Sequence, residues 1–196
     1  PTECGTKIRK GKSYSQNAEI VDLLLSAGAI VMGKTATSEL AYLGPSNTTN
    51  PHDYSRTPGG SSSGSAAAVA SFMAPLSIGS QTGGSIIRPA SYCGVVGYKP
   101  TYGLISRNGV LKTSEKLDHI GVFGRSVKDV ATLARVLIKK DNYDPATVHY
   151  STEDMLLETK KGPLFEPKFI FYKTDKWKLI EKKSRESFEY FIKSFK

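Results

Sequence analysis

The stretch TPGGSSSGSAAAVASFMAPLSIGSQTGGSIIRPASYCGVVGYKP, residues 57–100, contains two glycine–serine turns. The first is Gly59–Gly64, with the sequence GGSSSG, and the second is Gly83-Gly84-Ser85. Glycine permits backbone conformations that are closed to other residues, and it leaves main-chain N–H groups exposed. A small polar side chain beside such N–H groups suits either anion binding or a nucleophile with an oxyanion hole. Ser61 and Ser85, one in each turn, are the candidates.

The residues between the two turns predict a helix followed by a strand. Ala66-Ala67-Ala68-Val69-Ala70 is typical of a tightly packed helix, and Pro75-Leu76-Ser77-Ile78-Gly79 is typical of a short buried strand. The first turn therefore opens the helix, and the strand delivers the second turn close to the first. This layout indicates an active site.

Outside this stretch, helical and strand patterns alternate, which predicts an α/β fold. Apolar spacing followed by a glycine predicts a helix over 18–27. The sequence Ser126-Val127-Lys128-Asp129 predicts a capping box that opens another helix. The other expected segments are a buried strand at 29–33, a short helix at 38–41, a polar surface excursion at 141–166, a strand at 169–172 and a helix at 177–195.

The composition is that of a globular protein. The chain has 196 residues, of which 39% are hydrophobic and 23% charged, and this length can bury a sizeable core. It contains no apolar run of membrane-spanning length, so no membrane partner is expected. The two cysteines, Cys4 and Cys93, fit a reducing compartment better than a disulfide framework, and we therefore expect a cytoplasmic protein.

The net charge of +9 raises the question of nucleic-acid binding. The basic residues of 151–196 are interleaved with acidic ones, and no recognised nucleic-acid-binding motif is present. Scattered lysines of this kind more often form a solvated surface. A nucleic-acid partner is therefore not expected.

Two other interpretations of the glycine-rich turns are weaker. Residues 60–64 match the G-x-S-x-G pattern of a nucleophile elbow, but that elbow directly follows a strand, and residues 56–59 are not one. A phosphate-binding loop is not supported, because the Walker spacing and its lysine are absent. A purely structural role for the glycines and serines remains an alternative.

A serine nucleophile needs a base. The only histidines are His52, His119 and His149, and none has a carboxylate partner nearby in the sequence. A lysine made neutral by burial is an alternative base. No two His, Cys, Asp or Glu residues show a metal-ligand spacing, so we expect neither a metal nor an organic cofactor.

Three runs closely resemble the amidase signature family. They are Gly59–Ala70, Gly79–Pro89 and Cys93–Thr101, and shorter matches extend the likeness over about residues 1–140. The resemblance implies an α/β fold with a mixed β-sheet core that helices cover on both faces. It also implies that residues 1–196 are part of one domain, with the core motif at 57–101 and a continuation at 141–196.

In that family, a serine–serine–lysine triad hydrolyses amides through an acyl-enzyme. Carried over to this sequence, Ser85 matches the nucleophile, and Ser61 matches a bridging serine that follows a cis peptide bond, here Gly60–Ser61. Ser62 would support the site from behind without reaching the substrate. The oxyanion hole corresponds to the main-chain N–H groups of Thr82, Gly83, Gly84 and Ser85.

Some features depart from the family pattern. Gln81 stands where many members have aspartate, and Arg88 stands one place later than the usual arginine. This looks like the variant of a branch of stand-alone amidases, and it weakens the likeness to the A subunits of tRNA-dependent amidotransferases. The family's lysine precedes the motif that Pro1–Thr6 resembles, and Lys34 belongs to a motif without a triad role. We therefore expect the lysine upstream of Pro1, and no hydrolysis by residues 1–196 alone.

The resemblance thus implies an amidase that hydrolyses a carboxylic amide C–N bond and releases ammonia or an amine. Its partner is a small-molecule amide, and formation of a homodimer stays open. Two alternatives stand beside this function. One is a protein like the A subunit of glutamyl-tRNA(Gln) amidotransferase, and the other is a catalytically silent scaffold.

Overall fold

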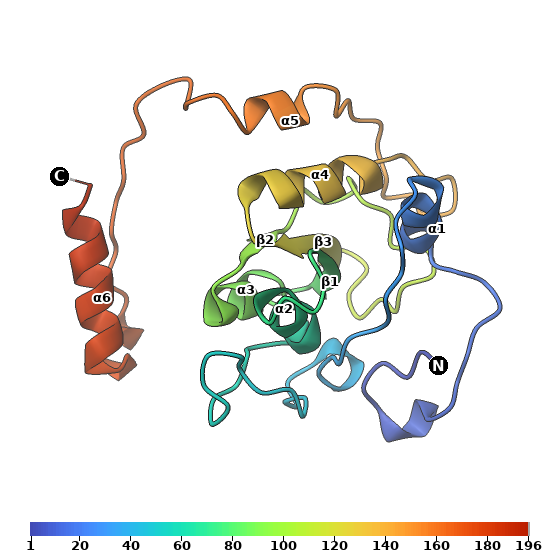
Figure 1. Ribbon diagram of the computed structural model, residues 1–196, viewed down its shortest axis with the longest axis horizontal. Helices are drawn as coiled ribbons and strands as arrows, with labels where there is room; N and C mark the ends of the chain where they lie inside the picture. Colours follow the sequence, from blue (N-terminus) through green and yellow to red (C-terminus); the bar gives the residue numbers. More distant parts are fainter. Residues whose placement is uncertain (196) are drawn as a thin grey trace. The chain divides into compact units, whose positions relative to one another are not determined.

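The computed structural model describes residues 1–195, and the chain divides into two compact units. Unit 1 comprises residues 1–160, and unit 2 begins at Lys161. Both glycine–serine turns lie in unit 1 (Figure 1). The expectation that the whole chain is part of one domain stays a prediction.

Unit 1 consists of helices and three short strands. In chain order they are η1 (Lys7–Arg9), α1 (Glu19–Ser26), η2 (Glu39–Ala41), α2 (Ser63–Ala70), β1 (Ser77–Gln81), α3 (Ile87–Cys93), β2 (Val96–Tyr98), β3 (His119–Gly124), α4 (Val127–Leu137) and α5 (Met155–Glu158). The expected helices at 18–27 and 38–41 correspond to α1 and to the 3₁₀ helix η2. The helix and strand between the two turns correspond to α2 and β1, with β1 two residues later than expected.

The strands of unit 1 form one sheet in the order β1-β3-β2, and both pairings are antiparallel. Gly79 of β1 lies opposite Gly121 of β3, and Gly97 of β2 lies opposite Phe123 of β3. The α/β class is confirmed. The resemblance implies a mixed sheet, but all strand pairs among the described residues are antiparallel.

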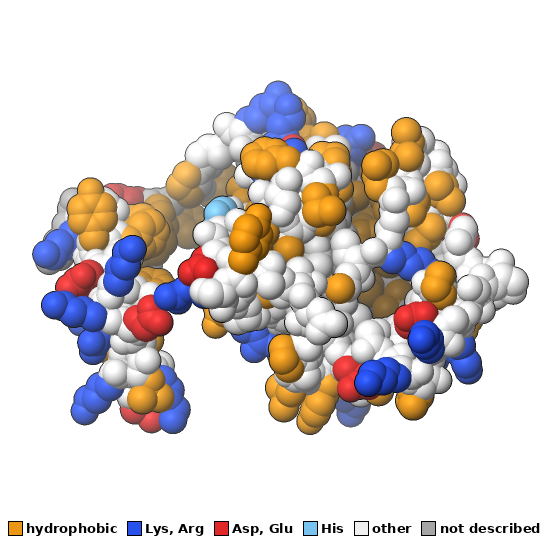
Figure 2. Space-filling view, turned by 60° about the horizontal axis from the view of Figure 1, so that its bottom comes forward, with side chains coloured by type: hydrophobic (Ala, Val, Ile, Leu, Met, Phe, Trp, Pro, Cys, Tyr) orange, Lys and Arg blue, Asp and Glu red, His pale blue; other side chains and the backbone are white. Residues whose placement is uncertain are grey.

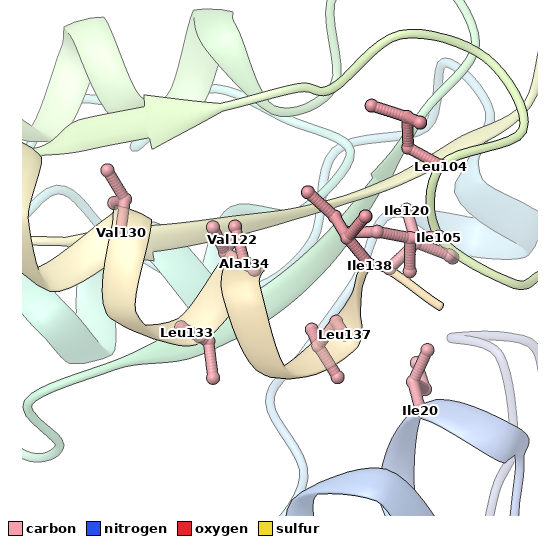
Figure 3. Packing of buried hydrophobic residues seen from close by; sticks show 10 residues of the cluster. All are labelled: Ile20, Leu104, Ile105, Ile120, Val122, Val130, Leu133, Ala134, Leu137 and Ile138. Atoms are coloured by element: carbon pink, nitrogen blue, oxygen red, sulfur yellow. The ribbon is translucent and has the colours of Figure 1, made fainter. Parts of the chain in front are cut away.

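The central strand β3 places its side chains alternately toward two layers of helices. Ile120 and Val122 belong to a cluster that includes residues of α4 and α1, and Figure 3 shows this packing. Phe123 points the other way and packs with α2 and α3. Val122 and Phe123 are both completely buried. Helices therefore cover both faces of the sheet, as expected.

The helix α4 begins at the capping box that the sequence predicts. The Ser126 hydroxyl accepts a hydrogen bond from the Asp129 N–H at 3.1 Å, and the Asp129 carboxylate accepts one from the Ser126 N–H at 3.0 Å. These bonds satisfy two N–H groups that the helix itself leaves without partners. The inward face of α4 then buries Val130, Leu133, Ala134 and Leu137 against β3.

Residues 29–33 do not form the expected buried strand. They have no regular secondary structure, and Ile30 and Met32 are 84% and 78% exposed. An apolar segment becomes a strand only where a neighbouring strand pairs with its N–H and C=O groups. No strand in the described part of the chain does so, and this prediction is wrong.

Residues 141–147 are not the surface excursion that their polar composition predicts. Asp141, Asp144 and Thr147 are each at most 7% exposed. The Asp144 carboxylate binds the guanidinium of Arg107, with Oδ1 2.9 Å from Nη2 and Oδ2 3.0 Å from Nε. The polar side chains point inward because a buried arginine needs an anionic partner.

The described part of unit 2 contains two helical elements, the 3₁₀ helix η3 (Asp175–Leu179) and the helix α6 (Lys182–Lys193). They replace the single helix that the sequence predicts at 177–195. The expected strand at 169–172 is also wrong, since these residues lack regular structure. The ring of Phe171 instead packs edge-on against Trp177, with 5.3 Å between centroids.

Two features of the described residues concern the expected absence of membrane and nucleic-acid partners: the apolar length of the helices and the distribution of basic side chains. No helix in the described part of the chain is long and apolar enough to cross a membrane. On the face in view in Figure 2, Lys and Arg side chains are dispersed among acidic, polar and hydrophobic ones.

Candidate active site

The first turn holds Ser61 through its main chain. The Gly60–Ser61 peptide bond is cis, as the resemblance implies. The Ser61 carbonyl oxygen accepts two hydrogen bonds, from the Ser38 N–H at 3.0 Å and from the Thr37 hydroxyl at 2.9 Å. The segment that leads into η2 therefore fixes this turn from outside.

The Ser61 side chain is buried without a hydrogen-bond partner among the described residues. The residue is 2% exposed, and its Oγ atom contacts no donor or acceptor within hydrogen-bond range. An unsatisfied buried hydroxyl costs about 1–3 kcal/mol. Each group of this kind in a folded protein calls for an explanation.

Ser62 and Ser63 fasten the turn to its surroundings. The Ser62 hydroxyl donates to the Ser80 carbonyl oxygen and accepts from the Ser80 N–H, both at 3.2 Å. The Ser63 hydroxyl donates to the Gly59 carbonyl oxygen at 2.8 Å. Gly79 makes room for the contact between Ser62 and Ser80, because a Cβ atom on residue 79 would lie 2.5 Å from Ser62 Oγ. Ser62 thus connects the first turn to β1. Its role as a supporting residue of the site stays a prediction.

The second turn connects the end of β1 to the start of α3. The Gln81 side-chain oxygen accepts hydrogen bonds from the N–H groups of Ile86 and Ile87, at 2.8 and 3.0 Å. Gln81 therefore caps the helix that begins two residues after Ser85. Ser85 is 8% exposed, at the bend between strand and helix.

Two hydrogen bonds join the turns to each other. The Ser62 N–H donates to the Ser85 carbonyl oxygen at 3.3 Å. Arg88, one helical turn beyond Ser85, donates from Nε to the Gly60 carbonyl oxygen at 3.0 Å. The structure therefore brings Ser61 and Ser85 into one site, although they come from separate elements.

The backbone of the second turn offers donors without acceptors. In the described part of the chain, no oxygen accepts a hydrogen bond from the main-chain N–H groups of Thr82, Gly83, Gly84 or Ser85. Thr82 and Gly83 are exposed, and Gly84 is half-buried. These main-chain N–H groups are therefore free to bind an acceptor that the described residues do not provide.

Asp118 holds the second turn from the side of β3. Its carboxylate accepts hydrogen bonds from the Thr82 hydroxyl and from the N–H groups of Thr113 and Ser114, at 2.5, 2.5 and 2.8 Å. Burial alone raises the pKa of Asp118, but the hydrogen bonds from Ser114, Thr82 and Thr113 together keep it below its usual value. No pattern in the sequence points to this residue.

The titratable side chains that the sequence offered as a base lie elsewhere. The ring of His52 contacts the Cys93 carbonyl oxygen at 2.8 Å, and that of His119 contacts the Leu117 carbonyl oxygen at 2.6 Å. None of the described lysines hydrogen-bonds to Ser61 or Ser85. Burial raises the pKa of Cys93 to about 11, so this thiol stays protonated near neutral pH.

Three supporting contacts were missed in the sequence: those of Thr37 and Ser38 to Ser61, and that of Asp118 to Thr82. A segment of small and mostly polar residues, Thr35 to Ser38, was the one available signal for the first two. Across residues 1–195, no group of three His, Cys, Asp or Glu side chains is arranged to hold a metal ion.

A family model described as Amidase matches residues 1–196. The chain belongs to the amidase family. This result agrees with the two glycine–serine turns, the cis bond before Ser61 and the three-layer packing around β3.

Several amidase-family proteins are similar to this chain. The A subunit of glutamyl-tRNA(Gln) amidotransferase from Methanosarcina mazei is 45% identical over 172 residues, which cover 83% of this chain and 36% of the relative. The crystal structure of the same subunit from Thermotoga maritima matches with a TM-score of 0.73 and 42% identity, over 76% of this chain and 34% of that one. The peptide amidase of Stenotrophomonas maltophilia matches with a TM-score of 0.74 and 37% identity, over 80% and 35%.

The chain thus resembles both an amidase and a component of an amidotransferase. It spans about a third of the length of these relatives.

Proposed function

We propose that the protein is an amidase that hydrolyses a carboxylic amide through an acyl-enzyme on Ser85. Ser61 relays the proton to a lysine that lies outside the described residues. The main-chain N–H groups of Thr82, Gly83, Gly84 and Ser85 bind the oxyanion. The substrate is a small-molecule amide, and we propose a cytoplasmic protein with no metal or organic cofactor.

In the proposed reaction, the Ser85 oxygen attacks the amide carbonyl carbon while its proton passes to Ser61, and the Ser61 proton passes to the lysine. The negative charge that develops on the carbonyl oxygen is stabilised by the free N–H groups of the second turn. Collapse of this intermediate breaks the C–N bond, and the lysine returns the proton to the leaving nitrogen. Water then attacks the Ser85 ester in the same way and releases the carboxylic acid.

The observation that carries this proposal is the Ser61 hydroxyl, which is buried and has no partner among the described residues. A structural serine at that position would use its hydroxyl to satisfy a neighbouring group, as Ser62 and Ser63 do. A relay serine instead keeps its hydroxyl for a base and a nucleophile. The hydrogen bond from the N–H of the next residue, Ser62, to the Ser85 carbonyl oxygen supports this pairing of the two serines.

The proposal is tested by trapping the acyl-enzyme. The intact protein is incubated with a panel of simple amides, quenched in acid and digested, and the peptide that contains Ser85 is weighed by mass spectrometry. We expect an added acyl group on that peptide and release of ammonia or amine. An acyl group found only on another residue contradicts the assignment.

We expect Ser61→Ala to lower kcat by about 10²–10⁴-fold, because proton transfer then lacks its relay. The fold should persist, since the Ser61 side chain makes no hydrogen bond in the described structure, while its main chain keeps both of its contacts. Rates of a single turnover on a chromogenic amide provide the measurement. Ser91→Ala, an exposed serine on α3, is the matched control. Equal rates for the two variants would exclude a relay at Ser61.

Arg88 bears on the choice of substrate. Its Nε atom holds the Gly60 carbonyl oxygen, and its guanidinium lies 3.9 Å from the Cβ position of Gly84. The remaining donors of this exposed guanidinium have no acceptor in the described part of the chain. A planar cation beside the oxyanion donors suits an anionic group of a substrate.

We therefore expect Arg88→Gln to lower kcat/KM by about 10–100-fold for amides that carry a carboxylate, as loss of a charged hydrogen bond predicts. Neutral amides of the same length should lose less, because they lose only the support at Gly60. Initial rates on matched pairs of acidic and neutral amides measure this difference. An equal loss on both members of each pair would contradict the role in substrate choice.

A second candidate function rests on the relatives. Two of those named above are A subunits of glutamyl-tRNA(Gln) amidotransferase, so we also consider that the protein works as such a subunit. Hydrolysis of simple amides by the isolated protein favours the amidase. Activity that appears only with partner subunits and charged tRNA favours the amidotransferase.

A further inference from the structure

The segment Thr113–Asp118 is a surface loop without helix or strand, yet it contacts the second turn directly. It closes on itself, because the Asp118 N–H donates to the Ser114 carbonyl oxygen at 3.1 Å while the Ser114 N–H donates to the Asp118 carboxylate. The Asp118 side chain is 7% exposed. Among the described residues, the one hydrogen bond that this buried carboxylate makes outside the loop comes from the Thr82 hydroxyl.

The far side of the loop is fixed independently. The Glu115 carbonyl oxygen accepts hydrogen bonds from Arg107 Nη1 at 2.6 Å and from the Tyr102 hydroxyl at 2.7 Å. Arg107 is itself held by the buried carboxylate of Asp144. Hydrogen bonds thus hold the loop at Glu115, and the loop in turn binds the second turn through Asp118.

Thr82 is the first residue of the second turn, and it lies between the end of β1 and the glycines. Glycines hold their conformation weakly, so the direction of the N–H groups at 83 and 84 depends on how the two ends of the turn are fixed. Gln81 fixes the end toward α3 through two hydrogen bonds. The hydrogen bond from Thr82 to Asp118 is the corresponding restraint at the other end.

We propose that Asp118 is a positioning residue for oxyanion stabilisation: through Thr82 it aims the N–H groups of the second turn at the reacting carbonyl. This inference rests on the proposed acyl-enzyme function. A role as general base is disfavoured, because the carboxylate is already occupied by the donors of Thr82, Thr113 and Ser114.

The sign of the effect separates positioning from simple electrostatics. Asp118 carries a negative charge and hydrogen-bonds to the turn that binds the oxyanion in the proposed function. Were its charge the only influence, Asp118→Asn would remove a repulsion and speed the reaction. Positioning predicts the opposite, because the amide cannot accept from all of these donors together. We expect kcat to fall by about 10–100-fold with KM little changed, as for misaligned oxyanion donors.

Thr82 provides the test that does not depend on the stability of the loop. Thr82→Val removes the hydroxyl from an exposed residue and keeps the main-chain N–H. We expect it to lower kcat as much as Asp118→Asn, and Thr82→Ser to restore the rate because it restores the hydroxyl. The double variant Asp118→Asn with Thr82→Val should be no slower than either single variant, since both remove the same contact.

The measurement is kcat per active site in the intact protein, with active sites counted by labelling with a serine-directed phosphonate. A wild-type kcat for Thr82→Val, a faster Asp118→Asn variant, or additive losses in the double variant would each overturn the inference. Failure of the underlying function looks different, because the wild type would then hydrolyse no amide, or Ser85→Ala would retain the wild-type activity. The two failures are therefore distinguishable.

Discussion

Ser85→Ala is expected to abolish amide hydrolysis, with a loss in kcat of at least about 10⁴-fold. The variant also should not react with a serine-directed phosphonate, because the attacking oxygen is gone. Its fold should be unchanged, since the Ser85 main chain keeps the hydrogen bond from the Ser62 N–H and its hydroxyl makes no hydrogen bond within the described structure. Steady-state rates and intact mass after labelling measure both effects.

Ser91→Ala is the matched control for this experiment, because Ser91 is an exposed serine a few residues further along the same segment. It should react with the phosphonate and hydrolyse amides like the wild type. A label that persists in Ser85→Ala, mapped to another serine, would refute the assignment of the nucleophile. Residual turnover near the wild-type rate would do the same.

The second large effect concerns stability. The side chains of Arg107 and Asp144 are 3% and 1% exposed. Asp144→Asn leaves the buried arginine with only the exposed Glu115 carboxylate, 3.2 Å from its Nη2 atom, as an anionic partner. We expect a loss of about 3–5 kcal/mol in the free energy of unfolding. Denaturant unfolding of the intact protein, followed by circular dichroism, measures the change.

Two comparisons make this result specific. Arg56 and Asp53 form an exposed ion pair at 3.1 Å, and Arg56→Gln should change the free energy of unfolding by only about 0–1 kcal/mol. Replacing both buried partners, with Arg107→Met and Asp144→Leu together, should cost less than Asp144→Asn alone, because no charge is left unpaired. A single variant as stable as the wild type would show that the pair is not needed.

The same pair predicts the dependence of stability on pH. The hydrogen bond from Arg107 lowers the pKa of Asp144 from its usual 3.8 to about 2, against the opposing effect of burial. A carboxyl group with a lowered pKa in the folded state contributes stability that is complete above its unfolded value and is lost on acidification. The contribution of Asp144 should therefore decline between about pH 5 and pH 2, and Asp144→Asn should lack this part of the decline.

The parts of the fold that the sequence predicts well are those decided by local chemistry. The helix α4 follows from its capping box, and α2 follows from a run of alanines between a glycine turn and a strand. The closeness of the two turns follows from the helix and strand between them, and the family resemblance adds the roles of Ser61 and Ser85. The residues themselves favoured an active site but left its base open.

The features that the sequence did not predict depend on contacts between residues that are distant in the chain. Residues 29–33 are apolar enough for a strand, but strand formation needs a partner that local pattern cannot supply. Residues 141–147 are polar, and they are buried because Arg107, far away in the chain, requires Asp144. Asp118 went unnoticed for the same reason, since its bond to Thr82 spans 36 positions.

Gln81 has a consequence for how the protein responds to acid. Many amidase-signature sequences resemble this one but carry aspartate at this position, and an aspartate acceptor is lost when it binds a proton. A carboxamide does not titrate, so the Gln81 bonds to Ile86 and Ile87 persist at any pH at which the chain stays folded. The bend that presents Ser85 is thus insensitive to protonation on its helical side. Loss of the Gln81 hydrogen bonds should accordingly make no contribution to the acid limb of the rate profile.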